Sequence, residues 1–200
     1  DLVAERYLDI DNFIDYQLAV LYGGNFDIGN VKCWRPRATR GRFRWLLYDQ
    51  DYAFDLWPPE VYQPAMARDY ADYRNMFRFY TTGTNTSVGW PNGAGQTLIF
   101  RSLLQNARFR ERFVRRCTDL LNSLFREDHV AQTIQEMAAA LRPEIGAHLH
   151  RWSWEELVAR GFGTPHQPEY QPFLPETWEA NINGLLDFAA ARPAKIRHDC

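Results

Sequence analysis

Four polar side chains in the segment from Tyr22 to Phe54 have the types needed to bind a divalent metal ion and to accept a proton. They are Asp27, Asn30, Asp49 and Asp51. Magnesium and manganese bind hard oxygen ligands and keep waters, so one or two carboxylates and an amide carbonyl suffice when phosphate oxygens complete the shell. Asp49 and Asn30 are therefore the candidate metal ligands, with Asp51 beside Asp49. Asp27 could accept a proton from a substrate hydroxyl.

The same four residues also have a purely structural interpretation. Asp27 and Asn30 could only shape a turn, and Asp49 and Asp51 could only cap the segment that follows them. An Asp-x-Asp pair is also found in glycosyltransferases, in haloacid-type phosphatases and in many loops. A metal-dependent hydrolase or glycosyltransferase that uses Asp49 and Asp51 is therefore a further hypothesis.

A β-hairpin is expected to bring these residues together. Residues 31–34 and 42–47 each alternate in the manner of a strand, and a basic turn over residues 36–41 separates them. With the turn centred near residues 38 and 39, antiparallel pairing places position 30 opposite about 47 and position 28 opposite about 49. Asp27 and Asn30 then lie beside Asp49 and Asp51 at the open end of the hairpin.

Helices are expected to support the hairpin on both sides of it in the sequence. The first runs from residue 10 to residue 21, with Asp9 and Asp11 able to cap its first turn and Gly23-Gly24 ending it. Later apolar periodicities predict helices near 98–104, 109–124, 128–142 and 178–188. Asp128 can cap the third of these, Pro143 should kink or end it, and the last should stop before Arg192-Pro193.

The segment from residue 55 to residue 95 is rich in Pro, Gly, Asn and Thr and is predicted to be a functional or covering loop, with a short helix around 66–79. The whole chain, residues 1–200, is predicted to form a single α+β domain that is mostly α. Because it begins at Asp1 without Met, we expect a processed or excised piece of a longer protein.

Composition excludes several classes of protein. A net charge of −2 gives no overall attraction to nucleic acid, and the local arginine clusters are expected to be solvated faces. No apolar run approaches the roughly 20 residues that span a bilayer. Cys33, Cys117 and Cys200 show no spacing typical of zinc or disulfides; the first two are expected in the core and the third in the tail.

Several runs of the chain resemble one family in the order in which the family has them. They are DNFIDYQLAVLYGGNFDIGNVKCWRP, GRFRWLLYDQDYAF, ARFRERFVRRCTDLLNSLF, EMAAALRPEI and WEANINGLLDFAAARPAKIR. Together they resemble the C-terminal portion of the spore-coat CotH family of atypical protein kinases. The resemblance implies a protein-kinase-like C-terminal lobe in which a β-hairpin carries the metal site and a helical bundle surrounds it.

The resemblance also implies roles for residues and ligands. Asp27 matches the catalytic aspartate, Asp49 the metal-binding aspartate and Asn30 a second metal ligand. The implied reaction is transfer of the ATP γ-phosphate, with Mg²⁺ or Mn²⁺, to Ser or Thr of secreted or coat proteins. The implied location is extracellular, at the cell surface or in the spore coat. By the same resemblance, we expect the nucleotide-binding lobe, with its phosphate-anchoring Lys and Glu, to lie outside this sequence.

A non-catalytic coat or surface scaffold is the alternative hypothesis. Such a protein would keep the kinase-like fold and use the 55–95 segment and its aromatic patches to hold partners. A scaffold should show no metal-dependent nucleotide binding, whereas the kinase requires both ATP and the metal ion. The sequence predicts neither the protein substrate nor the oligomeric state.

Overall fold

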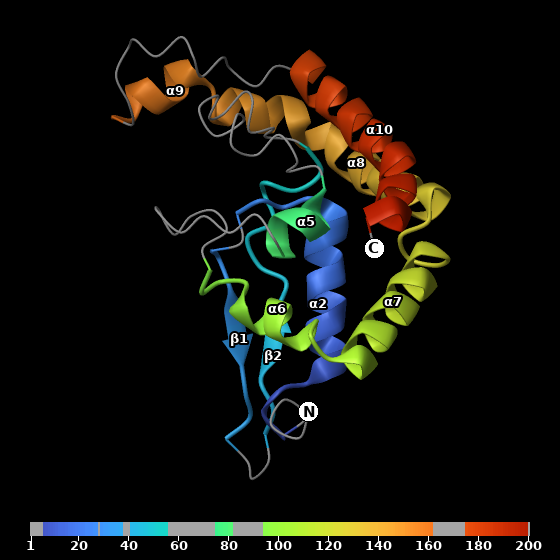
Figure 1. Cartoon of the computed structure of the whole chain (residues 1–200). Helices are drawn as coiled ribbons and strands as arrows, with labels where there is room; N and C mark the ends of the chain where they lie inside the picture. Colours follow the sequence, from blue (N-terminus) through green and yellow to red (C-terminus); the bar gives the residue numbers. More distant parts are fainter. Residues whose placement is uncertain are drawn as a thin grey trace.

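The computed structural model describes residues 6–27, 29–37, 41–55, 75–81, 94–161 and 175–199. It is a mostly helical α+β fold with a small two-stranded antiparallel sheet (Figure 1). In chain order the elements are α2 (Ile10–Gly23), β1 (Lys32–Trp34), β2 (Arg44–Leu46), α5 (Met76–Thr81), α6 (Leu98–Leu103), α7 (Ala107–Leu121), α8 (Glu127–Arg151), α9 (Trp154–Ala159) and α10 (Pro175–Asp199). The predicted fold class is confirmed at this level.

Helix α2 lies at the centre of the fold, between the hairpin and α7 (Figure 1). Its N-cap is Asp9, whose carboxylate accepts a hydrogen bond from the backbone N–H of Asn12 at 3.2 Å. Its C-cap is Gly24 at φ +69°, a left-handed conformation that glycine adopts without strain. Both predicted ends of this helix are confirmed.

The core forms because α2 carries apolar residues around most of its circumference. On one side the Phe13 ring meets the Trp45 ring of β2 edge-on, with centroids 4.6 Å apart. Phe100 of α6 and Phe113 of α7 complete this cluster, and all four of these side chains are buried. At the other end of α2, the Tyr22 ring stacks on Phe125 at 4.3 Å.

The hairpin is confirmed, and its register differs from the prediction by one residue. Cys33 pairs with Trp45 and Lys32 with Leu46, which places position 30 opposite 48 rather than 47. Asn12 joins the hairpin to α2, because its side-chain oxygen accepts the Trp45 N–H at 2.6 Å and its NH₂ donates to the Trp45 carbonyl at 3.2 Å. The Asn12 side chain thus makes the two backbone hydrogen bonds to Trp45 that a neighbouring strand would otherwise make.

The cysteine predictions divide. Cys117 is buried in α7, as expected. Cys33 was predicted to lie in the core, but it is exposed: it lines a cavity beside the hairpin, while its cross-strand partner Trp45 is buried against Phe13. Cys200 lies outside the described residues.

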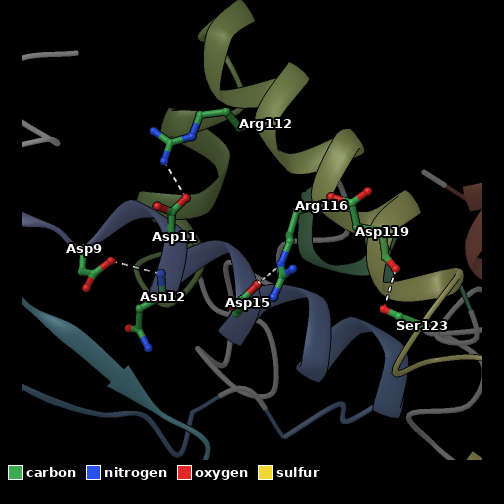
Figure 2. A network of polar contacts seen from close by, with 8 residues as sticks. All are labelled: Asp9, Asp11, Asn12, Asp15, Arg112, Arg116, Asp119 and Ser123. Atoms are coloured by element: carbon green, nitrogen blue, oxygen red, sulfur yellow. Dashed lines mark hydrogen bonds and ion pairs between the residues drawn. The ribbon is translucent and has the colours of Figure 1, made fainter. Parts of the chain in front are cut away.

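The arginine-rich face of α7 is partly matched by acids on α2, as Figure 2 shows. Arg112 donates to Asp11 at 2.5 Å, and Arg116 donates to both carboxylate oxygens of Asp15 at 2.6 and 3.1 Å. These pairs are solvent-exposed, so each contributes at most about 1 kcal/mol to stability. They orient α7 against α2 more than they strengthen the fold.

Neither proline ends its helix, so the predicted stop before Arg192-Pro193 was wrong, and of the two outcomes predicted for Pro143, a kink or an end, the end is not found. Helix α8 continues through Pro143 to Arg151, and α10 continues through Pro193 to Asp199. The two long helices lie side by side (Figure 1), and Arg142 of α8 donates to Glu179 of α10 at 2.7 Å. Packing between the helices compensates for the backbone hydrogen bond that each proline removes.

Three smaller outcomes concern other elements. Asp128 is not the cap of α8, because the helix begins at Glu127 and the Asp128 carboxylate accepts from Arg126 and from the His129 N–H instead. Within the described part of the 55–95 segment, α5 is helical where the end of a helix was predicted; most of that segment lies outside the described residues. In the described parts of the chain, every helix is too short or too polar to cross a membrane.

Candidate functional site

The loop that carries Asp27 starts from a firmly held helix end. The Gly24 N–H donates to the carbonyl oxygens of Val20 and Leu21 at 3.1 and 3.3 Å. Arg192 of α10, only 3% exposed, donates from Nε to the Tyr22 carbonyl at 2.7 Å and from a terminal nitrogen to the Leu21 carbonyl. Carbonyls at the end of a helix carry partial negative charge, so a buried guanidinium is a suitable partner for them.

Asn25 connects the two loops on which the candidate residues lie. Its side chain is almost fully buried, at 1% exposure. The side-chain oxygen accepts the Asp27 N–H at 2.9 Å, and the NH₂ group donates to the Asp49 carbonyl at 3.1 Å. Its own carbonyl accepts a hydrogen bond from the Tyr80 hydroxyl at 3.2 Å. One buried amide therefore fixes the backbone of Asp27 relative to that of Asp49.

Asp27 and Asn30 are in direct contact. The Asn30 NH₂ group donates to the Asp27 carboxylate at 2.8 Å. This contact turns the nitrogen of the amide toward Asp27, so the oxygen of Asn30 is the atom that could face a cation. Asn30 is exposed, and Asp27 is partly exposed, so a substrate could reach both.

Asp49 has an unusual backbone and an unusual charge environment. Its φ is +54°, in the left-handed region, where Asp and Asn are among the few side chains tolerated without large cost. A hydrogen bond with Asp51, partial burial, and the negative charges of Asp51 and Asp27 raise the pKa of the Asp49 carboxyl above its ordinary value, and Lys32 opposes this rise. A cluster of acids that repel one another in this way is the charge environment that a bound cation would relieve.

The donor set suits a divalent cation held partly by water and phosphate. Among the described residues, no group of three or more His, Cys, Asp or Glu has the geometry of a complete metal site. Mg²⁺ and Mn²⁺ seldom need such a cage, because they retain waters and accept ligands from phosphate oxygens. Asp49, Asp51 and Asn30 would therefore supply an incomplete shell that a bound nucleotide could finish.

Of the residues predicted for the site, the structure brings Asn30 to Asp27 through a direct hydrogen bond, and it places Asp51 and Asp27 close enough to Asp49 to raise its pKa. Their roles as base and metal ligands stay predictions. Sequence reasoning missed Asn25 and Arg192. Asn25 had a signal, since an asparagine directly after a Gly-Gly helix end is a common place for a side chain that binds backbone groups.

The pKa of Asp49 leads to a prediction about the metal-free protein. Because this pKa is raised in the folded state, Asp49 binds its proton more tightly there than when unfolded. Its contribution to stability is greatest below the ordinary carboxyl value of 3.8 and is lost as the pH rises through the raised pKa. Asp51→Asn removes a like charge and can donate to the Asp49 carboxylate, so we expect a smaller loss of stability with rising pH.

The measurement is the melting temperature with a chelator present, from about pH 3 to about pH 7. Asp119→Asn, the same change at an exposed position on α7, is the matched control and should leave the pH dependence unchanged. Identical pH profiles for wild type and Asp51→Asn would show that Asp51 does not raise the pKa of Asp49.

Comparison with known proteins gives one result. The family model described as CotH kinase protein matches residues 3–196, which is nearly the whole chain. Searches of the curated proteins and of the solved structures found no match.

Proposed function

The chain belongs to the CotH kinase protein family, and we propose that it contributes the catalytic base and metal ligands of an atypical protein kinase. The reaction would transfer the γ-phosphate of ATP to Ser or Thr of secreted or coat proteins. The observation that carries the proposal is that the side chain of Asn25 bonds to both loops. Its oxygen accepts the Asp27 N–H at 2.9 Å, and its NH₂ group donates to the Asp49 carbonyl at 3.1 Å. Phosphoryl transfer needs a base and a metal ligand held at fixed relative positions, because catalysis consists largely of positioning and charge neutralisation.

Each residue has a definite role in this proposal. Asp27 accepts the proton of the substrate hydroxyl, and Asn30 orients its carboxylate through the 2.8 Å hydrogen bond. Asp49 and the Asn30 oxygen would hold Mg²⁺ or Mn²⁺, and Asp51 supports Asp49 or adds a ligand. When bound, the metal ion supplies positive charge that neutralises the phosphate oxygens. Because the pKa of Asp49 is raised, its carboxylate charge becomes available at a higher pH than that of an ordinary aspartate.

Two measurements test this proposal. The first is calorimetric titration of the 200-residue chain with Mn²⁺, with and without ATP. The second is transfer of labelled γ-phosphate to a Ser-rich peptide, with the nucleotide-binding lobe that the family resemblance implies supplied in the same polypeptide. The proposal requires saturable Mn²⁺ binding that Asp49→Asn weakens, and metal-dependent transfer. Transfer that is absent, or that continues with a chelator present, would contradict it.

A non-catalytic scaffold of the coat or cell surface is the second candidate. The observation that favours it is a set of exposed apolar side chains on and beside the hairpin: Val31, Trp34, Leu46, Leu47 and Tyr48. Such residues are costly to expose in an isolated domain and are typical of a surface that contacts another protein segment. A scaffold predicts no nucleotide binding with or without Mn²⁺, so the same titration separates the two candidates.

A further inference from the structure

Strand β1 forms an open edge of the two-stranded sheet. In an antiparallel pair the N–H and C=O of one residue face the same side, and that side alternates along the strand. Trp45 of β2 directs both of its groups to the Asn12 side chain, away from β1. Cys33, which pairs with Trp45, therefore directs its own N–H and C=O away from β2. This side of β1 is the outer edge of the sheet, because β2 lies between β1 and α2 (Figure 1).

The backbone groups on this outer edge are available to a partner. Within the described residues, neither the N–H nor the C=O of Cys33 has a hydrogen-bond partner on that side. By the same alternation the Val31 C=O and the Arg35 N–H face outward, and no described group bonds to them either. Residues 31–37 are all exposed. Such a row of unpaired groups is a template for one further strand.

Three cations follow this edge. Lys32, Arg35 and Arg37 are exposed, and in the part of the chain that the structure describes none of them forms an ion pair. The Lys32 nitrogen lies 3.4 Å from the centre of the Tyr48 ring, and the Arg35 guanidinium lies 5.0 Å from that of Phe43. These rings hold the cations without neutralising them. The charges repel a second copy of the same edge and favour a segment that carries carboxylates.

A cavity of about 300 Å³ lies beside the same edge. Val31 and Cys33, two alternate residues on one face of the strand, line it, and the Phe13 and Trp45 rings form part of its wall. Side chains of an added strand would alternate between the two faces in the same way. One apolar side chain of that strand could therefore enter the cavity, while its neighbours would lie on the other face, beside Lys32.

The start of β1 leads directly to the candidate site. Gly29 and Val31, on either side of Asn30, both line the cavity. The Asn30 NH₂ group donates to the Asp27 carboxylate at 2.8 Å. Residues of a strand advance by about 3.3 Å each, so a segment that pairs at Cys33 reaches the level of Asn30 within about three residues. A hydroxyl at that level would lie beside the proposed base.

We propose that the outer edge of β1 binds an extended segment of the protein substrate in which acidic and apolar side chains alternate, and that this pairing brings a Ser or Thr hydroxyl to Asp27. Backbone hydrogen bonds to Cys33 hold the segment, and the cavity selects an apolar side chain. Added strands generally gain affinity from the backbone bonds and specificity from pockets for alternate side chains. The identity of the segment as the substrate rests on the proposed kinase function, whereas the pairing itself requires neither ATP nor a metal ion.

The first test is binding of a fluorescein-labelled peptide, Glu-Phe-Glu-Ser-Glu-Phe-Glu, to the 200-residue chain without ATP or metal ion. Fluorescence anisotropy should show saturable binding. The matched peptide with Lys in place of every Glu should bind at least about tenfold more weakly, because its charges are like those of the edge. Equal binding of the two peptides would contradict the acidic preference.

A proline at position 33 tests the backbone pairing. Cys33→Pro removes the outward N–H and leaves the hydrogen bonds to β2, since proline is tolerated in an edge strand where its N–H would face solvent. Loss of this bond should weaken peptide binding about tenfold. Cys33→Ala keeps the N–H and is the control, with an expected change of less than about threefold. Melting temperatures verify that both variants fold.

Methylated peptides test the same pairing in the wild-type chain. Two peptides carry N-methyl groups on either the odd or the even residues, and only one of these sets can face β1. One peptide should lose binding and the other should keep it. Equal effects of the two methylation patterns would overturn the proposal, as would the absence of saturable binding, which is the result expected if the cations only protect the edge from pairing.

The last measurement separates this inference from the kinase function. In the protein that includes a nucleotide-binding lobe, Cys33→Pro should raise the KM for the peptide about tenfold and leave kcat nearly unchanged, because the edge binds the substrate without taking part in the chemistry. Phosphoryl transfer with the same KM in Cys33→Pro would overturn the docking and leave the kinase function in place. Edge binding without transfer would contradict the kinase function and keep the edge as a docking site for a protein segment.

Discussion

Changing Asp27 to asparagine is expected to lower the rate of phosphoryl transfer about 10²–10⁴-fold, the range typical of losing a general base. Asparagine has nearly the same shape, and its oxygen can still accept the hydrogen bond that Asn30 donates at 2.8 Å. The backbone N–H of residue 27 can still donate to Asn25. The change therefore removes the basic carboxylate and leaves the geometry of the loop intact.

Metal dependence separates the role of Asp27 from that of Asp49. In Asp27→Asn the Mn²⁺ concentration for half-maximal rate should change only a few-fold, because the direct ligands remain, whereas in Asp49→Asn it should rise by more than about tenfold. Asparagine is the suitable replacement at position 49, because φ there is +54° and most other side chains would add backbone strain. Alanine at position 49 would mix a loss of ligand with a change of loop conformation.

Asp119→Asn is the control for a loss of one negative charge from the surface, and it should keep the full rate. The assay is transfer of labelled phosphate in the protein that includes a nucleotide-binding lobe, with circular dichroism to verify folding. If the Asp27→Asn variant keeps a third or more of the wild-type rate, then Asp27 is not the base. A rate loss accompanied by an equal loss of Mn²⁺ affinity would instead make Asp27 a metal ligand.

Local signals account for the parts of the fold that the sequence predicted well. An aspartate before an apolar periodic run and a Gly-Gly pair after it act through backbone groups within one turn, so they define α2 without help from the rest of the chain. The hairpin also follows from local alternation. Its register depends on how many residues the turn takes up, and that is where the one-residue error arose.

Contacts between distant segments account for what the sequence did not predict. Asn25 bonds to the carbonyl of Asp49, and Arg192 bonds to carbonyls about 170 residues earlier in the chain. The position of Asn25 after Gly-Gly suggests that its side chain binds backbone groups, but no local pattern identifies these distant partners. The rule that a helix ends before proline misplaced the end of α10, and with it the position of Arg192 inside a helix. In α10, packing against α8 and α2 outweighs the local tendency of proline to end a helix.

The candidate site shows the same division. Residue types and spacing were enough to select Asp27, Asn30, Asp49 and Asp51, because hard oxygen ligands near a strand end are a local feature. The contacts that hold them come partly from distant parts of the chain. They are the hydrogen bonds of the buried Asn25 side chain and the bond from Arg192 to the end of α2. Candidate site residues can thus be selected from their side-chain types, whereas the residues that position them are not predicted from the sequence.

Replacing Arg192 with alanine is expected to be strongly destabilising, although Arg192 would touch neither ATP nor a substrate hydroxyl in the proposed reaction. Its guanidinium binds the carbonyls of Leu21 and Tyr22, and its exposure is 3%. Alanine removes this donor from the Tyr22 carbonyl, while the Leu21 carbonyl keeps the Gly24 N–H; a buried group left unsatisfied costs about 1–3 kcal/mol. A loss of about 3 kcal/mol in the free energy of unfolding corresponds to roughly 6–12 °C in melting temperature for a domain of this size.

The loss is expected to affect the site, because the carbonyls that Arg192 binds belong to Leu21 and Tyr22, in the last turn of α2 before Gly24 and Asn25. Arg192→Lys keeps the positive charge but has no planar fork to bind two carbonyls at once, so it should restore only part of the stability. Arg197→Ala, an exposed arginine on the same helix, is the matched control and should change the melting temperature by little. Thermal unfolding followed by circular dichroism provides the measurement. If Arg192→Ala and Arg197→Ala melt at the same temperature, then the end of α2 is held by Gly24 and its own backbone bonds, and α10 does not position the loop that carries Asp27.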